Sequence, residues 1–117
     1  MRNMVRAAKA LSDETRLRIL NLLLERECCV CEVMQVLNIS QTRASRNLNI
    51  LLDAGFLKMR KEGLWAYYSI DTDSVPEYLP LFLQAVKQGL KDNKVINSDK
   101  KHLQENERLG PQSCCAK

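Results

Sequence analysis

Residues 30–55, VCEVMQVLNISQTRASRNLNILLDAG, contain two helical patterns separated by a very short connection. The first pattern ends at Asn38, a residue type that tolerates the left-handed conformation common after helices. Ser40 is a favourable N-cap for a second helix over residues 41–54, and Gly55 is suited to end that helix. Two helices joined by so short a turn predict a helix-turn-helix unit.

The second of these helices has two chemically different faces. Ala44, Leu48 and Leu51 recur at helical spacing and form an apolar face for a core. Short hydroxyl and amide side chains with an arginine occupy the other face, and such groups suit hydrogen bonds to base edges and phosphates. We therefore predict that DNA is contacted by Gln41, Thr42, Ser45, Arg46 and Asn49.

A basic β-hairpin is predicted directly after this helix. Residues 57–61 and 64–70 alternate apolar and other side chains on the two sides of Glu62-Gly63, which is the pattern of two strands and a turn. A hairpin beside a DNA-reading helix is a wing that reaches phosphates or the minor groove. Its candidate DNA contacts are Lys58, Arg60 and Lys61.

The remaining patterns are helical and favour self-association. A short helix is predicted over residues 3–11, and Ser12 is placed to cap the next one. A helix over residues 78–90 is apolar nearly all round at its start, so it needs cover that a second copy of a small chain supplies. The predicted fold is mostly α with a small β-hairpin: a winged helix-turn-helix homodimer with terminal helices at the dimer interface.

Length and composition allow one folded unit. The 117 residues fit a single domain, and 45% hydrophobic with 27% charged residues is typical of globular proteins. We assign residues 1–92 to the DNA-binding and dimerisation domain and residues 93–117 to a polar, mobile tail. The sequence offers no signal-peptide pattern and no run of about 20 apolar residues, so a cytoplasmic location without membrane contact is expected.

The cysteines form two clusters. An odd number of cysteines without an export signal argues against a disulfide scaffold and favours metal or redox chemistry. The five are Cys28, Cys29 and Cys31, and, in the predicted tail, Cys114 and Cys115.

Four segments are informative together through their order and spacing. They are KALSDETRLRIL (residues 9–20), CVCE (29–32), SQTRASRNL (40–48) and GLWAYY (63–68). With this combination the chain resembles the ArsR/SmtB family of bacterial metalloregulatory repressors, in its ArsR-type, arsenic-responsive branch. The resemblance implies a homodimer that binds double-stranded operator DNA and holds no permanent cofactor. It also implies release of that DNA when arsenite or antimonite binds cysteine thiolates, and no enzymatic activity.

The sequence departs from the family pattern in three places. Met34 stands where the arsenic-sensing motif has another cysteine, Cys28 stands where an apolar residue is usual, and Asn47 replaces a histidine of the recognition helix. The family's zinc site on the last helix is not expected, because the only histidine, His102, lies in the predicted tail.

The resemblance implies that trivalent arsenic takes three thiolates. Cys29 and Cys31 cannot converge on a regular helix, because residues two apart are about 200° apart around its axis. Either Cys29 precedes the helix, or ion binding unwinds the first turn. Cys28 and Cys31 would be neighbours on a helix, which makes Cys28 a candidate third ligand. Cys114 and Cys115 are the alternatives.

Three other functions fit parts of the sequence. A redox- or sulfide-responsive repressor of the same fold would use cysteine oxidation in place of ion binding. A thiol-disulfide oxidoreductase would use Cys28 and Cys31 as a CxxC pair, although the usual βαβ context is missing. A constitutive DNA-binding protein would respond to no ligand at all.

Overall fold

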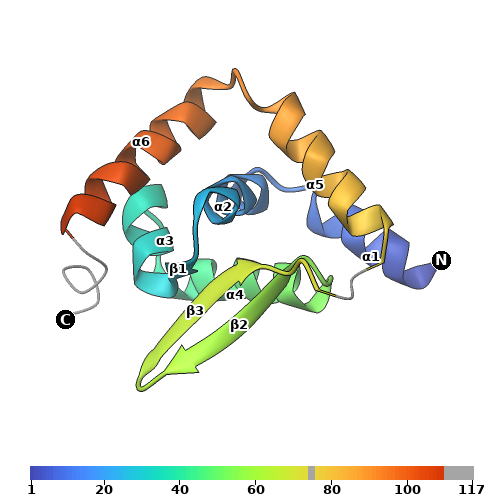
Figure 1. Cartoon of the computed structure of the whole chain (residues 1–117), viewed down its shortest axis with the longest axis horizontal. Coiled ribbons are helices and arrows are strands. Elements are labelled where there is room, and N and C mark those ends of the chain that lie inside the picture. Colours follow the sequence, from blue (N-terminus) through green and yellow to red (C-terminus); the bar gives the residue numbers. More distant parts are fainter. Residues whose placement is uncertain (74–75, 110–117) are drawn as a thin grey trace.

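The computed structural model describes residues 1–73 and 76–109, with side chains up to residue 106. It is mostly helical with a small antiparallel sheet, which confirms the predicted class (Figure 1). In chain order the elements are α1 (Arg2–Ala10), α2 (Glu14–Glu25), β1 (Cys28–Cys29), α3 (Val30–Leu37), α4 (Gln41–Asp53), β2 (Leu57–Glu62), β3 (Trp65–Ile70), α5 (Tyr78–Gly89) and α6 (Lys94–Leu109).

The turn between α3 and α4 has the predicted conformation. Asn38 ends α3 in the left-handed region, at φ 55° and ψ 53°. The Ser40 hydroxyl caps α4 by accepting a hydrogen bond from the Arg43 backbone N–H at 3.1 Å. Gly55 follows the end of α4 at φ +95°, where side-chain-bearing residues are strained. The helix-turn-helix prediction is confirmed.

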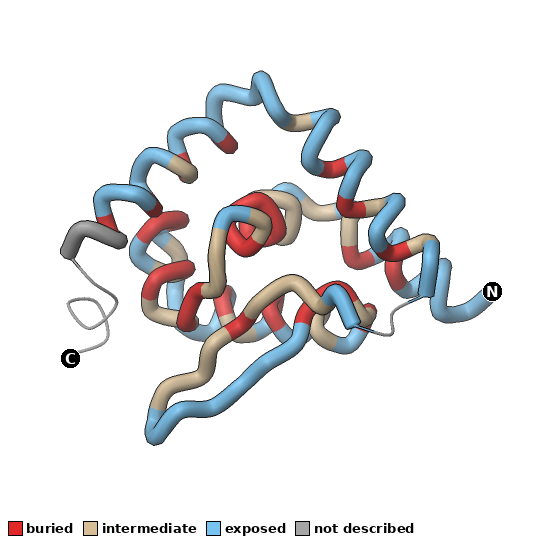
Figure 2. Tube along the Cα trace, in the orientation of Figure 1, coloured by how far each residue is buried: buried red, intermediate tan, exposed pale blue. Residues whose placement is uncertain are grey.

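The core is built around α2. Ile19, Leu20 and Leu22 are fully buried, and the apolar side of α4 packs in the same cluster through Leu48 and Leu51. Figure 2 shows buried positions on the inner sides of the helices, and Figure 1 shows α2 between α5 and α6 on one side and the sheet on the other. This packing leaves the outer side of α4 and most of β2 exposed.

Two predicted boundaries were wrong by a residue or two. The N-cap of α2 is Asp13, whose carboxylate accepts from the Arg16 backbone N–H at 3.0 Å, while the Ser12 hydroxyl donates to the Lys9 carbonyl. In the hairpin, Glu62 is paired with Trp65, so the turn is Gly63-Leu64 and not Glu62-Gly63. Gly63 takes the positive φ of 63° that the first central position of a tight hairpin favours.

A third strand joins the hairpin. β1 pairs with β3, with Cys28 opposite Tyr68 and Cys29 opposite Tyr67, and the sheet order is β1-β3-β2. The sequence analysis did not predict this strand. Its two residues are held by a partner that follows far along the chain, and so short a strand leaves no periodic pattern.

The prediction of a mobile tail from residue 93 was wrong over residues 94–109, which form α6. This helix packs against α2 and α3 through Ile96, Asp99, Leu103 and Asn106, which recur on one face. Asp99 is 3% exposed and accepts two hydrogen bonds from the Arg18 guanidinium, at 2.8 and 2.9 Å. The segment looks polar because only this narrow face is buried. Cys114 and Cys115 lie outside the described residues.

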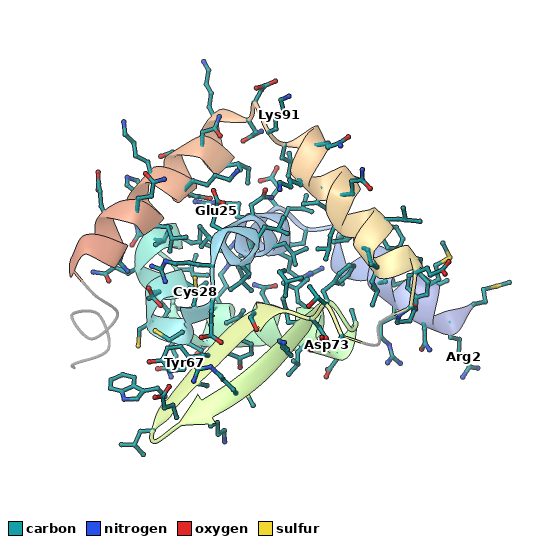
Figure 3. All side chains as sticks on the ribbon, in the orientation of Figure 1. Arg2, Glu25, Cys28, Tyr67, Asp73 and Lys91 are labelled. Atoms are coloured by element: carbon teal, nitrogen blue, oxygen red, sulfur yellow. The ribbon has the colours of Figure 1, made fainter. Side chains whose placement is uncertain are left out.

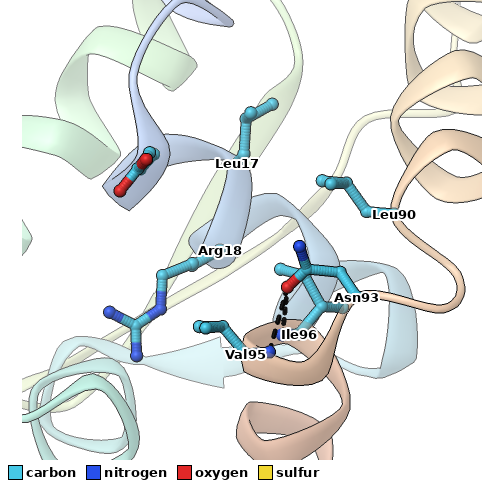
Figure 4. A pocket seen from close by; sticks show the side chains of 7 residues that line it. Leu17, Arg18, Leu90, Asn93, Val95 and Ile96 are labelled. Atoms are coloured by element: carbon cyan, nitrogen blue, oxygen red, sulfur yellow. Dashed lines mark hydrogen bonds between the residues drawn. The ribbon is translucent and has the colours of Figure 1, made fainter.

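A pocket of about 300 Å³ lies between α2 and the turn from α5 to α6. Leu17 and Arg18 line it from α2, and Leu90 lines it from the opposite side (Figure 4). The Asn93 side chain caps the start of α6: its Oδ1 accepts hydrogen bonds from the backbone N–H groups of Val95 and Ile96, at 2.9 and 3.2 Å. In the portion of the chain that the structure describes, every helix is too short or too polar to cross a bilayer.

Candidate nucleic-acid interface and thiol site

The outer face of α4 is open to solvent. Gln41, Thr42, Arg46 and Asn49 are exposed, and Ser45 is half-buried. The helix is held from behind by the buried Leu48 and Leu51, and by the Arg43 guanidinium, which donates to the Thr15 hydroxyl of α2 at 2.9 Å. The predicted DNA-reading residues therefore share one accessible surface on a well-anchored helix.

Asn47 has a different role from its neighbours on α4. It is 7% exposed, and its Oδ1 accepts from Nη1 of Arg16 at 3.0 Å. Its Nδ2 donates to the Arg43 carbonyl at 3.0 Å. Arg16 also donates through Nε to the Ala10 carbonyl at 2.7 Å, so it joins the end of α1 to α4. This link was not predicted from the sequence, because a buried asparagine and an exposed one look the same there.

Two of the three predicted wing cations have acidic partners. Lys58 lies 3.3 Å from an Asp73 carboxylate oxygen. Arg60 donates to both carboxylate oxygens of Glu27, at 3.0 and 2.7 Å, and to Glu62 at 2.6 Å. These ion pairs raise the pKa of Arg60. Within residues 1–73 and 76–106, Lys61 has no acidic partner, so the wing carries less uncompensated positive charge than its sequence predicts.

Cys29 and Cys31 lie together at the start of α3. Cys29 is the N-cap, with extended backbone at φ −86° and ψ 166°, and Cys31 belongs to the first turn. Glu32 completes a capping box: its carboxylate accepts from the Cys29 backbone N–H at 3.1 Å, and the Cys29 thiol faces the Glu32 backbone N–H. Of the two alternatives left open for this pair, the structure adopts the one in which Cys29 precedes the helix.

Cys28 does not occupy the position that made it a candidate ligand. It lies on strand β1 and not on a helix, so the expected helical neighbour relation to Cys31 is absent. Its side chain is fully buried in the main core. Successive strand residues point to opposite faces of a sheet, so the side chains of Cys28 and Cys29 leave β1 on opposite sides. Burial raises the pKa of the Cys28 thiol to about 12, with a further contribution from the Glu32 carboxylate. Both properties oppose a role as a thiolate ligand or as a redox nucleophile.

The start of α3 brings together two thiols, one half-buried and one buried. Cys31 is half-buried, and Cys29 is 2% exposed beside it in sequence. Among the side chains that the structure describes, no cluster of three His, Cys, Asp or Glu residues is placed to hold an ion. Within residues 1–73 and 76–106, the start of α3 thus offers two thiols and no complete three-thiol site.

The cysteines are physically connected to both predicted DNA-binding elements. On one side α3 continues through Asn38 into α4. On the other side Cys29 is paired with Tyr67 in the wing sheet, and Glu27, two residues before Cys29, holds Arg60. The Arg60 guanidinium also lies 4.6 Å from the centre of the Tyr67 ring. The sequence offers no local signal for the Glu27–Arg60 pair, because the two residues are 33 positions apart.

Comparison with known proteins assigns this arrangement to a family. Residues 13–59 match the model of the arsR family of bacterial regulatory proteins. The arsenic resistance transcriptional regulator ArsR2 of Pseudomonas putida is 45% identical over 89 residues, which span 73% of this chain and 77% of that relative. The chain belongs to the ArsR family. A second relative, a cadmium resistance transcriptional regulatory protein CadC homologue of Staphylococcus aureus, is 46% identical over 70 residues, or 59% of this chain and 58% of the relative.

Solved structures agree with this assignment to the ArsR family. The homodimeric winged helix-turn-helix DNA-binding domain from Mycobacterium bovis superposes with a TM-score of 0.64 at 29% identity, covering 79% of this chain and 82% of that one. The ArsR-family fold is that of DNA-binding transcriptional regulators and not of enzymes. The thiol-disulfide oxidoreductase is therefore excluded as a function.

Proposed function

We propose that this ArsR-family protein is a homodimeric, cytoplasmic repressor that releases operator DNA when trivalent arsenic or antimony binds the thiolates of Cys29 and Cys31. The observation that carries the proposal is the place of these two cysteines, at the N-cap and in the first turn of α3. That helix leads directly into α4, whose outer face presents the candidate base contacts. The inducer is a transient effector, and no resident cofactor is proposed.

The capping box gives a physical route from ion binding to DNA release. A sulfur that turns toward an ion no longer faces the Glu32 N–H, so the start of α3 loses its cap. Loss of an N-cap with a side-chain oxygen costs about 0.5–2 kcal/mol, and loss of the weaker sulfur acceptor lies toward the lower end of that range. Allosteric coupling energies are about 1–3 kcal/mol, which changes affinity by roughly 5–150-fold. The two ranges overlap, so a rearrangement confined to the first turn of α3 is large enough to account for release.

Three features support a homodimer. Met4 on α1 is 49% exposed, and Leu81 on α5 is 65% exposed. Apolar side chains on terminal helices are stabilised when a second copy covers them. The Mycobacterium bovis domain of the same fold is itself homodimeric.

The third thiolate is proposed to come from Cys114 or Cys115. Cys28 remains the alternative. Its side chain would have to leave the core, and its thiol, whose pKa is raised by burial, would have to lose its proton.

The test is fluorescence anisotropy on the protein's own upstream promoter DNA under reducing conditions, with arsenite as titrant. Wild type is expected to bind and then be released. Cys29→Ser and Cys31→Ser should bind equally well and stay bound, while Arg46→Ala should bind weakly from the start. Cys28→Ala is the matched control, and its normal release would show that Cys28 is not a required ligand.

Normal release of either serine variant would overturn the proposed site. If cadmium releases the wild-type protein from DNA and arsenite and antimonite do not, the proposed site is retained and the effector is cadmium. A response to peroxide or sulfide alone would favour the redox-sensing alternative. Binding indifferent to all of these would favour a constitutive DNA-binding protein.

A further inference from the structure

Helix α1 carries a stripe of positive charge. Arg2, Arg6 and Lys9 are spaced by four and three residues, so they lie along one face of the helix. All three are exposed, and α1 contains no acidic residue. We call these three residues the basic stripe. They are three of the 18 lysines and arginines of the chain, and because no acidic residue lies among them they make α1 a source of positive potential.

The basic stripe borders an open groove of about 350 Å³ between α1 and α4. The lining residues include four cations and no anion: Arg2, Val5, Arg6, Lys9, Ala10, Arg16 and Ile50. The fourth cation, Arg16, donates to the carbonyls of Lys9 and Ala10 and to the Asn47 amide. These partners are neutral, so they orient the guanidinium without cancelling its charge.

The charges of the basic stripe are uncompensated, unlike those of the wing. Lys58 and Arg60 each lie within ion-pair distance of a carboxylate. Arg2, Arg6 and Lys9 form no ion pair with any side chain that the structure describes. The attraction for an external polyanion is therefore concentrated at α1 and α4 more than at the hairpin, where the sequence alone locates it.

The groove is continuous with the outer face of α4. Ile50, which lines the groove, is four residues after Arg46 and therefore next to it on the same side of the helix. Figure 3 shows Arg2 at the outer end of α1 in the lower half of the view, the half into which the hairpin also extends, whereas Lys91 lies at the top. DNA placed against α4 and the wing would thus lie along the side to which Arg2 points.

We propose that Arg2, Arg6 and Lys9 form a second DNA-backbone contact, which binds phosphates beside the segment that α4 reads. The partner follows from charge complementarity, because a duplex presents closely spaced phosphates to arginine and lysine. The contact carries no sequence information and sets the position of the protein on the duplex. This inference rests on the proposed operator binding, and it does not depend on which effector releases the DNA.

The experiment compares two variants with the same change in net charge. One is Arg2→Gln, Arg6→Gln and Lys9→Gln. The control is Lys87→Gln, Lys91→Gln and Lys94→Gln, three exposed residues on α5, on the turn after it and at the start of α6. Affinity for the promoter DNA and for a shuffled sequence is measured from low to physiological salt without arsenite. The slope of log affinity against log salt is negative, and each lost phosphate contact should reduce its magnitude by about 0.9. Arg16 is left intact because it anchors α4.

The expected result is a shallower slope for the basic-stripe variant on both DNA sequences, with wild-type slope for the control. Equal slopes for the two variants would overturn the inference while leaving operator binding and release intact. A weakened variant that sediments as a monomer would also overturn it, because the stripe would then belong to an interface between copies. Wild-type protein that does not bind the promoter would remove the proposed function and this inference together.

Discussion

Glu27 holds the guanidinium of Arg60 through both of its carboxylate oxygens, at 3.0 and 2.7 Å. Glu27 directly precedes β1, the strand that contains Cys28 and Cys29, and Arg60 belongs to β2 of the wing. The pair therefore links the segment that carries the thiols to a residue predicted to contact DNA. It also occupies Arg60 in the absence of DNA.

Glu27→Gln should strengthen DNA binding, because it removes a carboxylate that competes with phosphates for Arg60. The slope of log affinity against log salt should steepen by up to about 0.9, the contribution of one phosphate contact, although Glu62 still accepts from Arg60. Glu25→Gln is the control: it makes the same charge change at the end of α2, where Glu25 lies 3.7 Å from Lys100. If DNA affinity rises equally in the two variants, the increase is caused by the change in net charge and not by release of Arg60.

Stability should decrease at alkaline pH through Cys28. Burial raises the pKa of its thiol from 9.0 to about 12, so the folded chain retains a proton that the unfolded chain loses. The free energy of unfolding is fully maintained below pH 9 and falls between pH 9 and 12, by about 1 kcal/mol per pH unit. Urea unfolding of effector-free wild type and Cys28→Ala at several pH values measures this.

The alanine variant should lose about 1 kcal/mol at neutral pH and show a weaker decline above pH 9. Tyr68, whose pKa is also raised by burial, contributes with the same sign and is present in both proteins. Parallel stability curves for the two proteins would mean that Cys28 ionises in the folded state as it does in the unfolded state.

The attachment of α6 should depend unequally on its two charged partners. Arg18→Ala leaves the Asp99 carboxylate, which is 3% exposed, without its guanidinium, and an uncompensated buried charge costs about 3–5 kcal/mol. Asp99→Ala leaves Arg18, which is 30% exposed and partly hydrated, so about 1.5–3 kcal/mol should be lost. Thermal or urea unfolding tests the order, and a larger loss for Asp99→Ala would contradict this account.

Asn47 and Asn49 should separate folding from DNA binding. Asn47→Ala removes a buried acceptor of the Arg16 guanidinium and should cost about 1–3 kcal/mol of stability. Asn49→Ala changes an exposed side chain, so stability should stay within about 0.5 kcal/mol while operator affinity falls. Urea unfolding and anisotropy on the same samples check both effects. Stability losses of equal size would show that Asn49 is also part of the packing.

The parts of the fold that depend on neighbouring residues could be predicted from the sequence. Asn38, Ser40 and Gly55 act within one helical turn of themselves, so their residue types predict the helix-turn-helix directly. The exposed face of α4 follows from periodicity in the same way.

The parts that depend on distant partners could not be predicted. Cys28 has the spacing of a helical neighbour of Cys31, but pairing with Tyr68 of β3 makes its segment a strand. Arg60 looks like a free cation until Glu27 is beside it. Helix α6 looks like a polar tail because its one buried face, containing Asp99 and Leu103, has meaning only against α2 and α3. Cys114 and Cys115 remain predictions beyond the described residues.

The ion pair between Arg18 and Asp99 joins residues 81 positions apart, and this separation has a consequence during protein synthesis. A chain that leaves the ribosome N-terminus first exposes α2 and α3 before α6 has been made. Until then the apolar surface later covered by Ile96 and Leu103 faces water and is open to association with other nascent chains. Helix α6 thus covers the apolar surface of α2 and α3 only when synthesis is nearly complete. A ribosome that stalls before residue 94 leaves that surface exposed.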